Sequence, residues 1–200
     1  MYTVLWSLIG FLLGSIPFSL CLGKLFINED IRKYGDGNPG AINAWKAGGY
    51  KIGVIALWLD FLKGAIPVGV AHFIFGIVGI QLIVVAIAPI IGHAFSPFLR
   101  FHGGKSVAVT FGIWTGLTLW AGPTIFGTAL GTFYLLKIAD AWSVIFSMLV
   151  LGIYPLIKQD DMFIIVIWLL NLIILIYKHR NELRGKIRKS YGTNMDKPSD

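Results

Sequence analysis

Cysteine is nearly absent from this 200-residue chain, in which Cys21 is the only one. A lone cysteine excludes an internal disulfide framework and any zinc site built on several cysteines. Because Cys21 lies in an apolar segment, we expect a buried, packed side chain. The sequence also has no His, Asp or Glu cluster with metal-ligand spacing and no Ser, His and Asp order typical of a hydrolase. We therefore expect neither a metal nor a cofactor.

Long polar stretches are also lacking, since 56% of the residues are hydrophobic and the mean hydropathy is +0.75. Apolar runs of roughly 17 to 25 residues recur, which is the length that a helix needs to cross a bilayer. We expect an all-α polytopic integral membrane protein with seven transmembrane helices, the first of them kinked at Pro17. The single membrane domain at 1–200 is expected to have spans at 2–22, 52–70, 77–95, 106–120, 123–136, 142–157 and 163–177, and a basic tail at 178–200.

Acidic residues are scarce, with 10 Asp and Glu against 17 Lys and Arg and a formal net charge of +7. One set of alternate loops carries most of the cations, namely Lys24, Arg32, Lys33, Lys46, Lys51, Arg100, Lys105, Lys137 and those of the tail. The opposite loops hold only Lys158. Loops rich in Lys and Arg stay in the cytosol, so we expect the N-terminus outside and the C-terminus in the cytosol. An anionic bilayer surface accounts for this charge without a nucleic-acid partner, and no oligomeric state is indicated.

The polar segment between the first two expected spans, residues 30–51, is unusually rich in glycine. It reads DIRKYGDGNPGAINAWKAGGYK and contains five glycines and two asparagines. Glycine permits turns with positive φ, and such turns can direct consecutive amides toward an anion. Two interpretations are open at this point: a solvated loop between membrane helices, or part of a binding site.

A second stretch of this character, Gly103-Gly104-Lys105-Ser106, lies just before the fourth expected span. The amides and the dipole of a helix N-terminus favour an anion, and Lys105 adds a full positive charge. The spacing of a nucleotide-binding phosphate loop is absent. By itself the stretch is more typical of a flexible turn with a cytosolic lysine, whereas its likeness to residues 30–51 favours an anion site.

Several titratable residues lie in or beside the expected spans. His93 sits where the third span meets the cytosol. Two roles are open for it there: proton transfer, or a hydrogen bond to a helix end. His179 and Arg180 follow the last span; arginine suits bidentate phosphate contacts, but a basic pair there is also a common orientation signal. Asp60 and Lys63 lie inside the second span, where charges are costly. Because residues i and i+3 share a helix face, we expect a structural ion pair.

In combination these stretches resemble the acyl-phosphate-dependent glycerol-3-phosphate acyltransferases of bacteria, the PlsY family. The family pattern DxR, GSGN, G, TN, Arg is matched by Asp30-Ile31-Arg32, Gly35-Asp36-Gly37-Asn38, Gly40, Ile42-Asn43 and Lys46. The pattern GH followed by FxxFLxFxGGK is matched by Gly92-His93, Phe95, Phe98-Leu99, Phe101 and Gly103-Gly104-Lys105. The likeness extends to Asp-Phe-Leu-Lys-Gly at 60–64 and Tyr-x-His-Arg at 177–180, and so covers nearly the whole chain.

The resemblance implies a seven-span enzyme of the bacterial cytoplasmic membrane with a cytosolic active face. Family members transfer an acyl group from acyl phosphate to the sn-1 hydroxyl of glycerol 3-phosphate, giving lysophosphatidic acid and phosphate, the first step of phospholipid synthesis. The resemblance also implies that Lys105, His179 and Asn43 are the catalytic residues. It implies that the substrate-binding residues are Arg32, Gly35, Asp36, Gly37, Asn38, Gly40, Lys46, His93, Gly103, Gly104 and Arg180.

Some positions depart from the family pattern. Asp36 stands where the family has serine, which places a carboxylate beside the expected dianion. Two anions in contact repel unless a cation lies between them or one is protonated. Lys46 replaces arginine and loses its bidentate fork. The remaining departures are Ile42 for threonine, Ser106 for glycine, Asp140 for serine, and Asn181-Glu182 for Glu-Asn.

Three hypotheses follow for the function. The chain is an acyltransferase with the family's reaction, a diverged paralogue with another acceptor or donor or without catalysis, or a transporter of an anionic metabolite. The charges inside the second span fit a transporter, but the inverted repeat of many transporters is absent. The first hypothesis requires Lys105 to lie beside Asn38 and Asn43.

Overall fold

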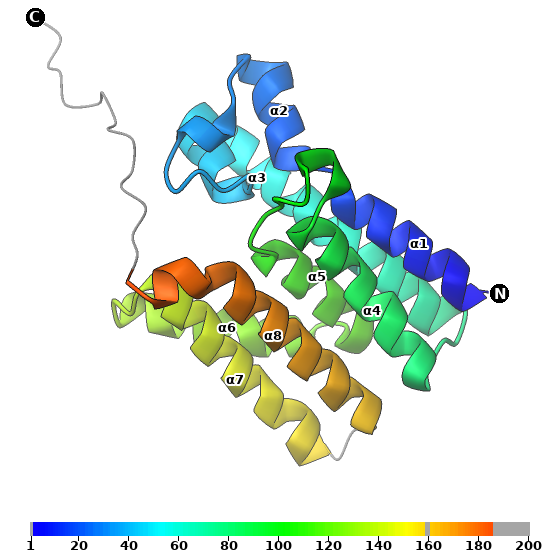
Figure 1. The fold of residues 1–200 in the computed structure, drawn as a ribbon. Coiled ribbons are helices and arrows are strands. Elements are labelled where there is room, and N and C mark those ends of the chain that lie inside the picture. Colours follow the sequence, from blue (N-terminus) through cyan, green and yellow to red (C-terminus); the bar gives the residue numbers. More distant parts are fainter. Residues whose placement is uncertain (1, 159–160, 186–200) are drawn as a thin grey trace, which may run out of the picture.

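The structure is a computed structural model that describes residues 2–158 and 161–185, and within these ranges every regular element is helical (Figure 1). The α-helices are α1 (Tyr2–Ser15), α2 (Phe18–Ile27), α3 (Ala41–Gly69), α4 (Gly79–Ala94), α5 (Val107–Thr118), α6 (Ala121–Leu135), α7 (Asp140–Lys158) and α8 (Met162–Leu183). Shorter helical turns are η1 (Ile31–Lys33), η2 (Val70–Ile74) and η3 (Pro97–Leu99). Of the expected basic tail, residues 186–200 lie outside the described residues.

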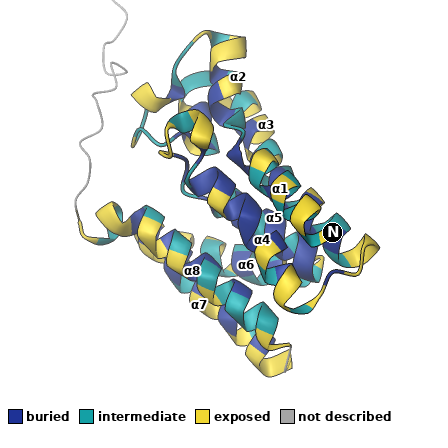
Figure 2. Ribbon diagram, turned by 45° about the vertical axis from the view of Figure 1, so that its right-hand side comes forward, coloured by how far each residue is buried: buried dark blue, intermediate teal, exposed yellow. Residues whose placement is uncertain are grey.

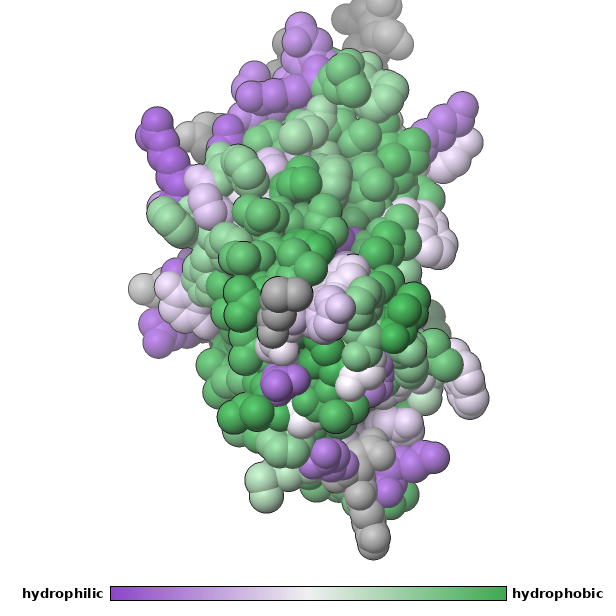
Figure 3. Space-filling model, turned by 90° about the vertical axis from the view of Figure 1, so that its right-hand side faces the viewer, coloured by the Kyte–Doolittle hydropathy of each residue, from purple (hydrophilic) through white to green (hydrophobic). Residues whose placement is uncertain are grey.

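Five stretches of the described chain are long and apolar enough to cross a membrane: Tyr2–Ile27, Ala41–Ile74, Gly79–Leu99, Asp140–Lys158 and Met162–Leu183. Helices α5 and α6 are shorter, with 12 and 15 residues. Many large apolar side chains are exposed, and the face in Figure 3 is mostly hydrophobic, with hydrophilic residues mainly toward its margins. The all-α fold is confirmed, whereas the seven crossings and the orientation of the termini remain predictions.

The first helical stretch is interrupted at Pro17, as expected. Helix α1 ends at Ser15 and α2 begins at Phe18, with Pro17 at φ −84° and ψ 67° between them. Proline breaks the helix because it lacks an amide donor and clashes with the preceding turn. Helix α2 then packs on its neighbours through Ser19, Leu20 and Gly23. Cys21 faces the other way and is exposed, so the expectation that it is buried was wrong.

Helix α3 begins at Ala41, well before residue 52, where the second span was expected to start. Asn43 and Lys46 therefore lie on a helix and not in a loop. The chain enters this helix from Gly40, which is extended, and alanine recurs in its first turns. Alanine is the strongest helix former, so these turns are favourable in spite of the nearby glycines. Gly49, with φ 76°, marks a kink within α3.

The helices form two groups in Figure 1, α1 to α5 and α6 to α8. They meet where α4 packs on α8 and α5 packs on α6. Figure 2 shows the buried residues concentrated on α4 and α5, the helices through which the first group contacts the second. At this contact the fully buried Trp114 donates from Nε1 to Asn171 Oδ1 over 3.2 Å, and Asn171 Nδ2 donates to Thr110 Oγ1 over 3.0 Å. These three buried polar side chains are thus paired with one another, as burial favours.

A buried ion pair joins α3 to the start of the chain. Lys63 Nζ lies 2.8 Å from Asp60 Oδ1, and the two side chains are only 2% and 3% exposed. Ser19 Oγ donates to Asp60 Oδ2 over 3.1 Å, and Lys63 Nζ donates to the Ile16 carbonyl over 3.1 Å. The expected structural ion pair is confirmed. It holds the break between α1 and α2 against α3.

Candidate functional site

The segment between α2 and α3 folds into tight turns around Asp36. Gly35 and Gly37, on either side of it, have φ of 57° and 76°, a region that favours glycine. Asp36 Oδ1 accepts the amide of Asn38 over 3.0 Å, which closes a local turn. The acidic side chain is therefore directed back toward the beginning of α3.

Asn43, in the first turn of α3, fixes this segment to the helix. Its Nδ2 donates to Asp36 Oδ1 over 2.8 Å and to the Asn38 carbonyl over 2.9 Å. Lys46 lies one turn further along α3, and a Cβ added to Gly35 would be 3.0 Å from Lys46 Nζ. The absence of a side chain at Gly35 thus leaves room for both Asn43 and Lys46.

The Gly103-Gly104-Lys105 stretch lies over the end of α4. The Gly104 amide donates to the His93 carbonyl over 3.0 Å, and a Cβ at Gly104 would collide with the His93 ring. From α8, Lys178 Nζ donates to the carbonyls of Ala94 and Gly103 over 2.8 and 2.9 Å. Glycine is required here because the backbone passes so close to His93.

Lys105 brings three parts of the chain together. Its Nζ lies 2.6 Å from Asp36 Oδ2 and 2.8 Å from Glu182 Oε1, which belongs to α8. Asp36 in turn binds Asn43 and the Asn38 amide. Through their shared contact with Asp36, Lys105 is linked to Asn38 and Asn43, in agreement with the spatial condition set by the sequence.

Lys105, Asp36, Glu182, Asn43 and the Asn38 amide form the Lys105 cluster. Its charges stabilise one another. Burial alone raises the pKa of the Asp36 carboxyl, but hydrogen bonding and attraction from Lys105 outweigh it, so the pKa lies below its ordinary value. Burial likewise lowers the pKa of Lys105, and its bonds to Asp36 and Glu182 reverse this and raise the pKa. Both groups are therefore ionised at neutral pH, and a cation does lie beside the Asp36 carboxylate.

His179 lies on α8 one turn before Glu182, so both side chains are on the same helix face. It is 3% exposed, and its Nδ1 is 2.9 Å from the Leu175 carbonyl. A carbonyl can only accept, so this contact places the proton of the neutral imidazole on Nδ1. Nε2 is then the nitrogen that can accept a hydrogen bond or a proton.

Three expected site residues have other contacts. The Arg32 guanidinium binds Asp30, with Nη2 and Oδ2 2.6 Å apart, and this bond lowers the pKa of Asp30 to about 2. Arg180 donates to the Tyr177 carbonyl over 2.6 Å and stacks on the Tyr177 ring. His93 lies beneath the glycine stretch, with Nδ1 3.8 Å from Asp60 Oδ1. The structure does not join these three side chains to Asp36 and Lys105.

Two residues that contact Lys105 or the glycine stretch before it were not among the expected site residues. Glu182 had a signal in the sequence, since it lies one helical turn after His179 and differs from the family pattern. Lys178 had no such signal beyond its place inside Tyr-x-His-Arg. Its partners are backbone carbonyls, and these cannot be inferred from residue types. Asp140, another departure, begins α7 and is exposed.

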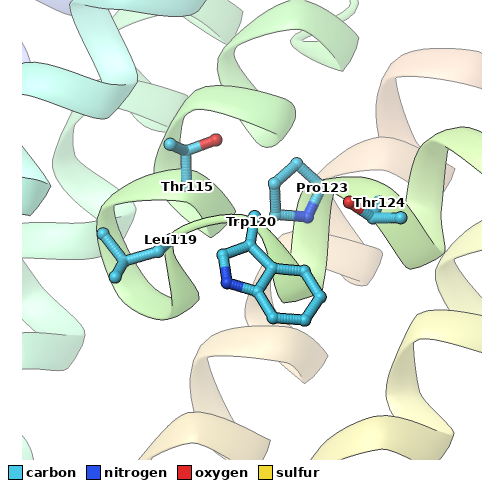
Figure 4. A pocket seen from close by; sticks show the side chains of 5 residues that line it. All are labelled: Thr115, Leu119, Trp120, Pro123 and Thr124. Atoms are coloured by element: carbon cyan, nitrogen blue, oxygen red, sulfur yellow. The ribbon is translucent and has the colours of Figure 1, made fainter.

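The larger of two hollows lies apart from the Lys105 cluster, whereas the smaller one borders Gly104. An open hollow of about 440 Å³ at the turn between α5 and α6 is lined by Thr115, Leu119, Trp120, Pro123 and Thr124 (Figure 4). Its lining includes no Lys, Arg or His side chain. A cavity of about 10 Å³ lies between Lys63, His93 and Gly104, about the size of one water molecule. The cluster itself is a partly exposed surface site.

The donors of the cluster suit an anion that carries several oxygens. Lys105, the Asn43 side-chain amide, the Asn38 backbone amide and the positive end of α3 converge there. Within residues 2–158 and 161–185 there is no group of three His, Cys, Asp or Glu residues placed to hold a metal ion. The arrangement can bind and orient a phosphate group and can stabilise negative charge that develops beside it.

Comparison with known proteins points the same way. Residues 4–189 match the profile of the family described as glycerol-3-phosphate acyltransferase. The chain is 38% identical to glycerol-3-phosphate acyltransferase 1 of Thermotoga maritima, covering 90% of this chain and 95% of that protein. It is 34% identical to the Lactococcus lactis subsp. lactis enzyme, with 92% and 90% covered. The crystal structure of PlsY, an integral membrane glycerol 3-phosphate acyltransferase in its glycerol 3-phosphate form, superimposes with a TM-score of 0.86 at 28% identity, covering 94% and 93%. A lysophosphatidic acid form of PlsY superimposes with a TM-score of 0.83.

Proposed function

This chain belongs to the glycerol-3-phosphate acyltransferase family, and from that premise we propose the reaction that it catalyses. It transfers an acyl group from acyl phosphate to the sn-1 hydroxyl of glycerol 3-phosphate, releasing lysophosphatidic acid and inorganic phosphate. The observation that carries the proposal is the convergence of Lys105 with Asp36 and Asn43, three residues from two separate segments of the chain. Both substrates carry a phosphate group, and this is where the donors for phosphate are gathered.

In this proposal the Lys105 ammonium binds a phosphate oxygen and neutralises charge that develops on the leaving phosphate. Asn43 and the Asn38 amide hold the phosphate of the acceptor, and Lys46 lies one turn along α3 to assist them. Gly35, Gly37, Gly40, Gly103 and Gly104 keep the backbone close enough for amides to reach the substrate. Arg32 and Arg180 approach from the rim, after release from Asp30 and Tyr177.

The bond changes are those of an acyl transfer. The sn-1 oxygen of glycerol 3-phosphate attacks the acyl carbonyl carbon, and the bond from that carbon to the phosphate oxygen breaks. The hydroxyl proton passes to phosphate, either that of the acceptor or the one that leaves. His179 Nε2 accepts a hydrogen bond from the hydroxyl and so orients it for attack. Because acyl phosphate is already activated, positioning and charge stabilisation supply most of the rate.

His93 has a supporting role in this scheme. Its ring is buried against Gly104, and its backbone carbonyl accepts the Gly104 amide. It therefore positions the glycine stretch beneath the substrate, through packing of the ring and a backbone hydrogen bond. It does not need to exchange a proton with substrate.

We further propose that the chain crosses a bacterial cytoplasmic membrane seven times, with the two short helices α5 and α6 completing the crossings. The N-terminus lies at the opposite end of the bundle from the end of α8 (Figure 1). The preponderance of cations in alternate loops supports a cytosolic position for the Lys105 cluster. A cytosolic face gives the soluble acceptor access, while the acyl chain of the donor stays in lipid.

The test uses purified protein in lipid, given acyl phosphate and glycerol 3-phosphate, with lysophosphatidic acid measured by mass spectrometry. We expect product, and we expect Lys105→Ala to reduce kcat/KM by about 10²–10³, the loss typical of a missing donor to a developing anion. Lys33→Ala is the matched control, because Lys33 is an exposed lysine whose ion pair is with Glu29. Its activity should be unchanged.

Other outcomes identify the other hypotheses. Product from a different phosphorylated or unphosphorylated alcohol, but not from glycerol 3-phosphate, would indicate a paralogue with another acceptor. Binding of glycerol 3-phosphate without product would indicate loss of catalysis. Exchange of labelled glycerol 3-phosphate across proteoliposomes without acyl transfer would indicate a transporter.

A further inference from the structure

Lys105, the lysine proposed to bind phosphate, is bound to two carboxylates of the protein itself. Asp36 approaches from the segment before α3, and Glu182 approaches from α8. The contacts of 2.6 and 2.8 Å are as short as those of a strong charge-assisted hydrogen bond. A ligand anion can reach the ammonium only by joining or displacing these groups.

Asp36 also accepts hydrogen bonds from the other donors that are expected to hold phosphate. Its Oδ1 accepts from the Asn38 amide over 3.0 Å and from Asn43 Nδ2 over 2.8 Å, while Oδ2 binds Lys105. A backbone amide, a side-chain amide and an ammonium around two oxygens are the partners that a phosphate would have there. The carboxylate thus occupies the place of an anionic ligand.

The charge balance of the cluster leads to the same conclusion. The single positive charge of Lys105 already faces two carboxylates, Asp36 and Glu182, before any dianion arrives. The pKa of Asp36 lies below its ordinary value because of Lys105, which keeps the carboxylate ionised at neutral pH. In the family pattern that this chain resembles, the position of Asp36 is serine, which carries no charge.

We propose that Asp36 is an internal competitor of the substrate: its carboxylate fills the phosphate position of the empty site, and glycerol 3-phosphate binds by displacing it from Lys105. This inference rests on the proposed function, and it names the residue that sets the affinity for the acceptor. Glu182 keeps the second contact to Lys105 during the exchange, so the lysine stays directed at the site. The chain therefore binds its acceptor more weakly than its phosphate donors would allow.

The central experiment removes the charge of Asp36, once with its size kept and once with a smaller side chain. Asp36→Asn and Asp36→Ser are assayed for KM toward glycerol 3-phosphate at saturating acyl phosphate. Removing a carboxylate that contacts Lys105 should lower KM on the order of tenfold, since a nearby unit charge at a partly buried site is worth at least that factor. The kcat should change much less, because the displaced carboxylate is out of the site in the transition state.

Glu29→Gln is the matched control. Glu29 is a partly exposed carboxylate in the same inter-helix segment, with a side chain 42% exposed, and it pairs with Lys33 across 3.6 Å. Its removal should leave KM unchanged. An equal fall in KM for Glu29→Gln and Asp36→Asn would overturn the proposal, because the general negative charge of the segment would then be responsible.

A structural role for Asp36 predicts the opposite result. If Asp36 only holds Asn43 and Lys105 in place, both Asp36 variants should raise KM, lower kcat and lower the melting temperature. An unchanged or raised KM therefore overturns the proposal. The two variants differ in shape, so a fall in KM for both assigns the effect to the lost charge.

A binding measurement separates this inference from the proposed reaction. Calorimetric titration with inorganic phosphate and with glycerol 3-phosphate, without acyl phosphate, should give about tenfold tighter binding for Asp36→Asn than for the unchanged protein. Tighter binding without lysophosphatidic acid production by any variant would support the competitor and refute the reaction. Lysophosphatidic acid production by the unchanged protein, with no tighter binding by Asp36→Asn, would support the reaction and refute the competitor.

Discussion

Two lysine–carboxylate pairs of similar length have opposite surroundings in this molecule. The Lys63–Asp60 pair, 2.8 Å apart, is 2% and 3% exposed within the helix bundle. The Lys105–Asp36 pair, 2.6 Å apart, is 25% and 39% exposed at one end of it. The open pair joins two segments distant in the sequence, whereas Lys63 and Asp60 are three residues apart on α3. The buried pair has its remaining contacts with the protein, at Ser19 and Ile16, whereas the open pair has surface on which a ligand can replace one partner.

The difference shows how burial decides what an ion pair can do. A buried pair that loses one member leaves a charge in a medium of low dielectric constant, which costs far more than the pair contributes. A partly exposed pair is screened, and water or another anion can take the place of either member at small cost. The first arrangement suits a structural joint and the second suits a binding site. The predictions below test this division.

The largest difference should appear when each lysine loses its charge. Lys63→Met should lower the free energy of unfolding by about 3–5 kcal/mol, since Asp60 is left buried and unpaired. Lys105→Met should lower it by less than about 1 kcal/mol while abolishing most of the activity. Thermal unfolding in detergent, beside the acyltransferase assay, measures both. Equal losses of stability would remove the distinction between the two pairs.

Lys178 has an intermediate position, half-buried and bound to the carbonyls of Ala94 and Gly103. Lys178→Met should lower kcat about tenfold, because two carbonyls lose their donor and the glycine stretch that carries Lys105 moves. KM for glycerol 3-phosphate should change less than kcat. Lys178→Arg, which retains the charge and the donors, should recover part of the rate. A matching loss for both variants would contradict this positioning role.

The open pair should also respond to pH, in a direction set by the lowered pKa of Asp36. Its stabilising effect is complete above the ordinary carboxyl pKa and is lost as pH falls through the lower pKa of the folded state. The difference in melting temperature between the unchanged protein and Asp36→Asn should therefore be constant near neutral pH. It should shift below pH of about 4, in the direction that favours Asp36→Asn. A shift already present between pH 6 and 8 would assign the effect to another group.

The smallest effect is expected at Ser106, the residue after Lys105. It precedes α5 with φ 64°, a conformation that costs energy for a residue with a Cβ. Ser106→Gly should raise the free energy of unfolding by about 0.4–1 kcal/mol. Ser106→Ala removes the same hydroxyl but keeps the Cβ, so it should not stabilise the protein. Equal effects of the two substitutions would mean that the hydroxyl matters and the backbone does not.

Much of this arrangement was predictable because its signals are local or periodic. Pro17 predicted the break between α1 and α2, and the i, i+3 spacing of Asp60 and Lys63 predicted their pairing. The glycine stretches and their cations predicted an anion site, and the resemblance supplied its chemistry. The start of α3 was missed because glycine and asparagine suggested a loop, while helix formation by the alanines and the contacts of Asn43 prevailed.

Other features depended on contacts between distant residues. The sequence shows Asp36 as a departure from the family pattern, but not that Lys105 and Asn43 close around it. Glu182 and Lys178 lie on α8, and only the packing of α8 on α4 brings them to the glycine stretch. Cys21 was misplaced because hydropathy indicates an apolar segment without indicating which of its faces has neighbours.

Hydropathy, glycine placement and charge asymmetry by themselves determined that this protein is helical and belongs in a membrane, and they predicted segments that bind phosphate, because each depends on composition over a few turns of chain. The tertiary structure alone decided that a carboxylate of the protein occupies the place of the phosphate. That outcome depends on the distances among Asp36, Asn43 and Lys105, which are set by how the helices pack and not by the spacing of these residues along the chain.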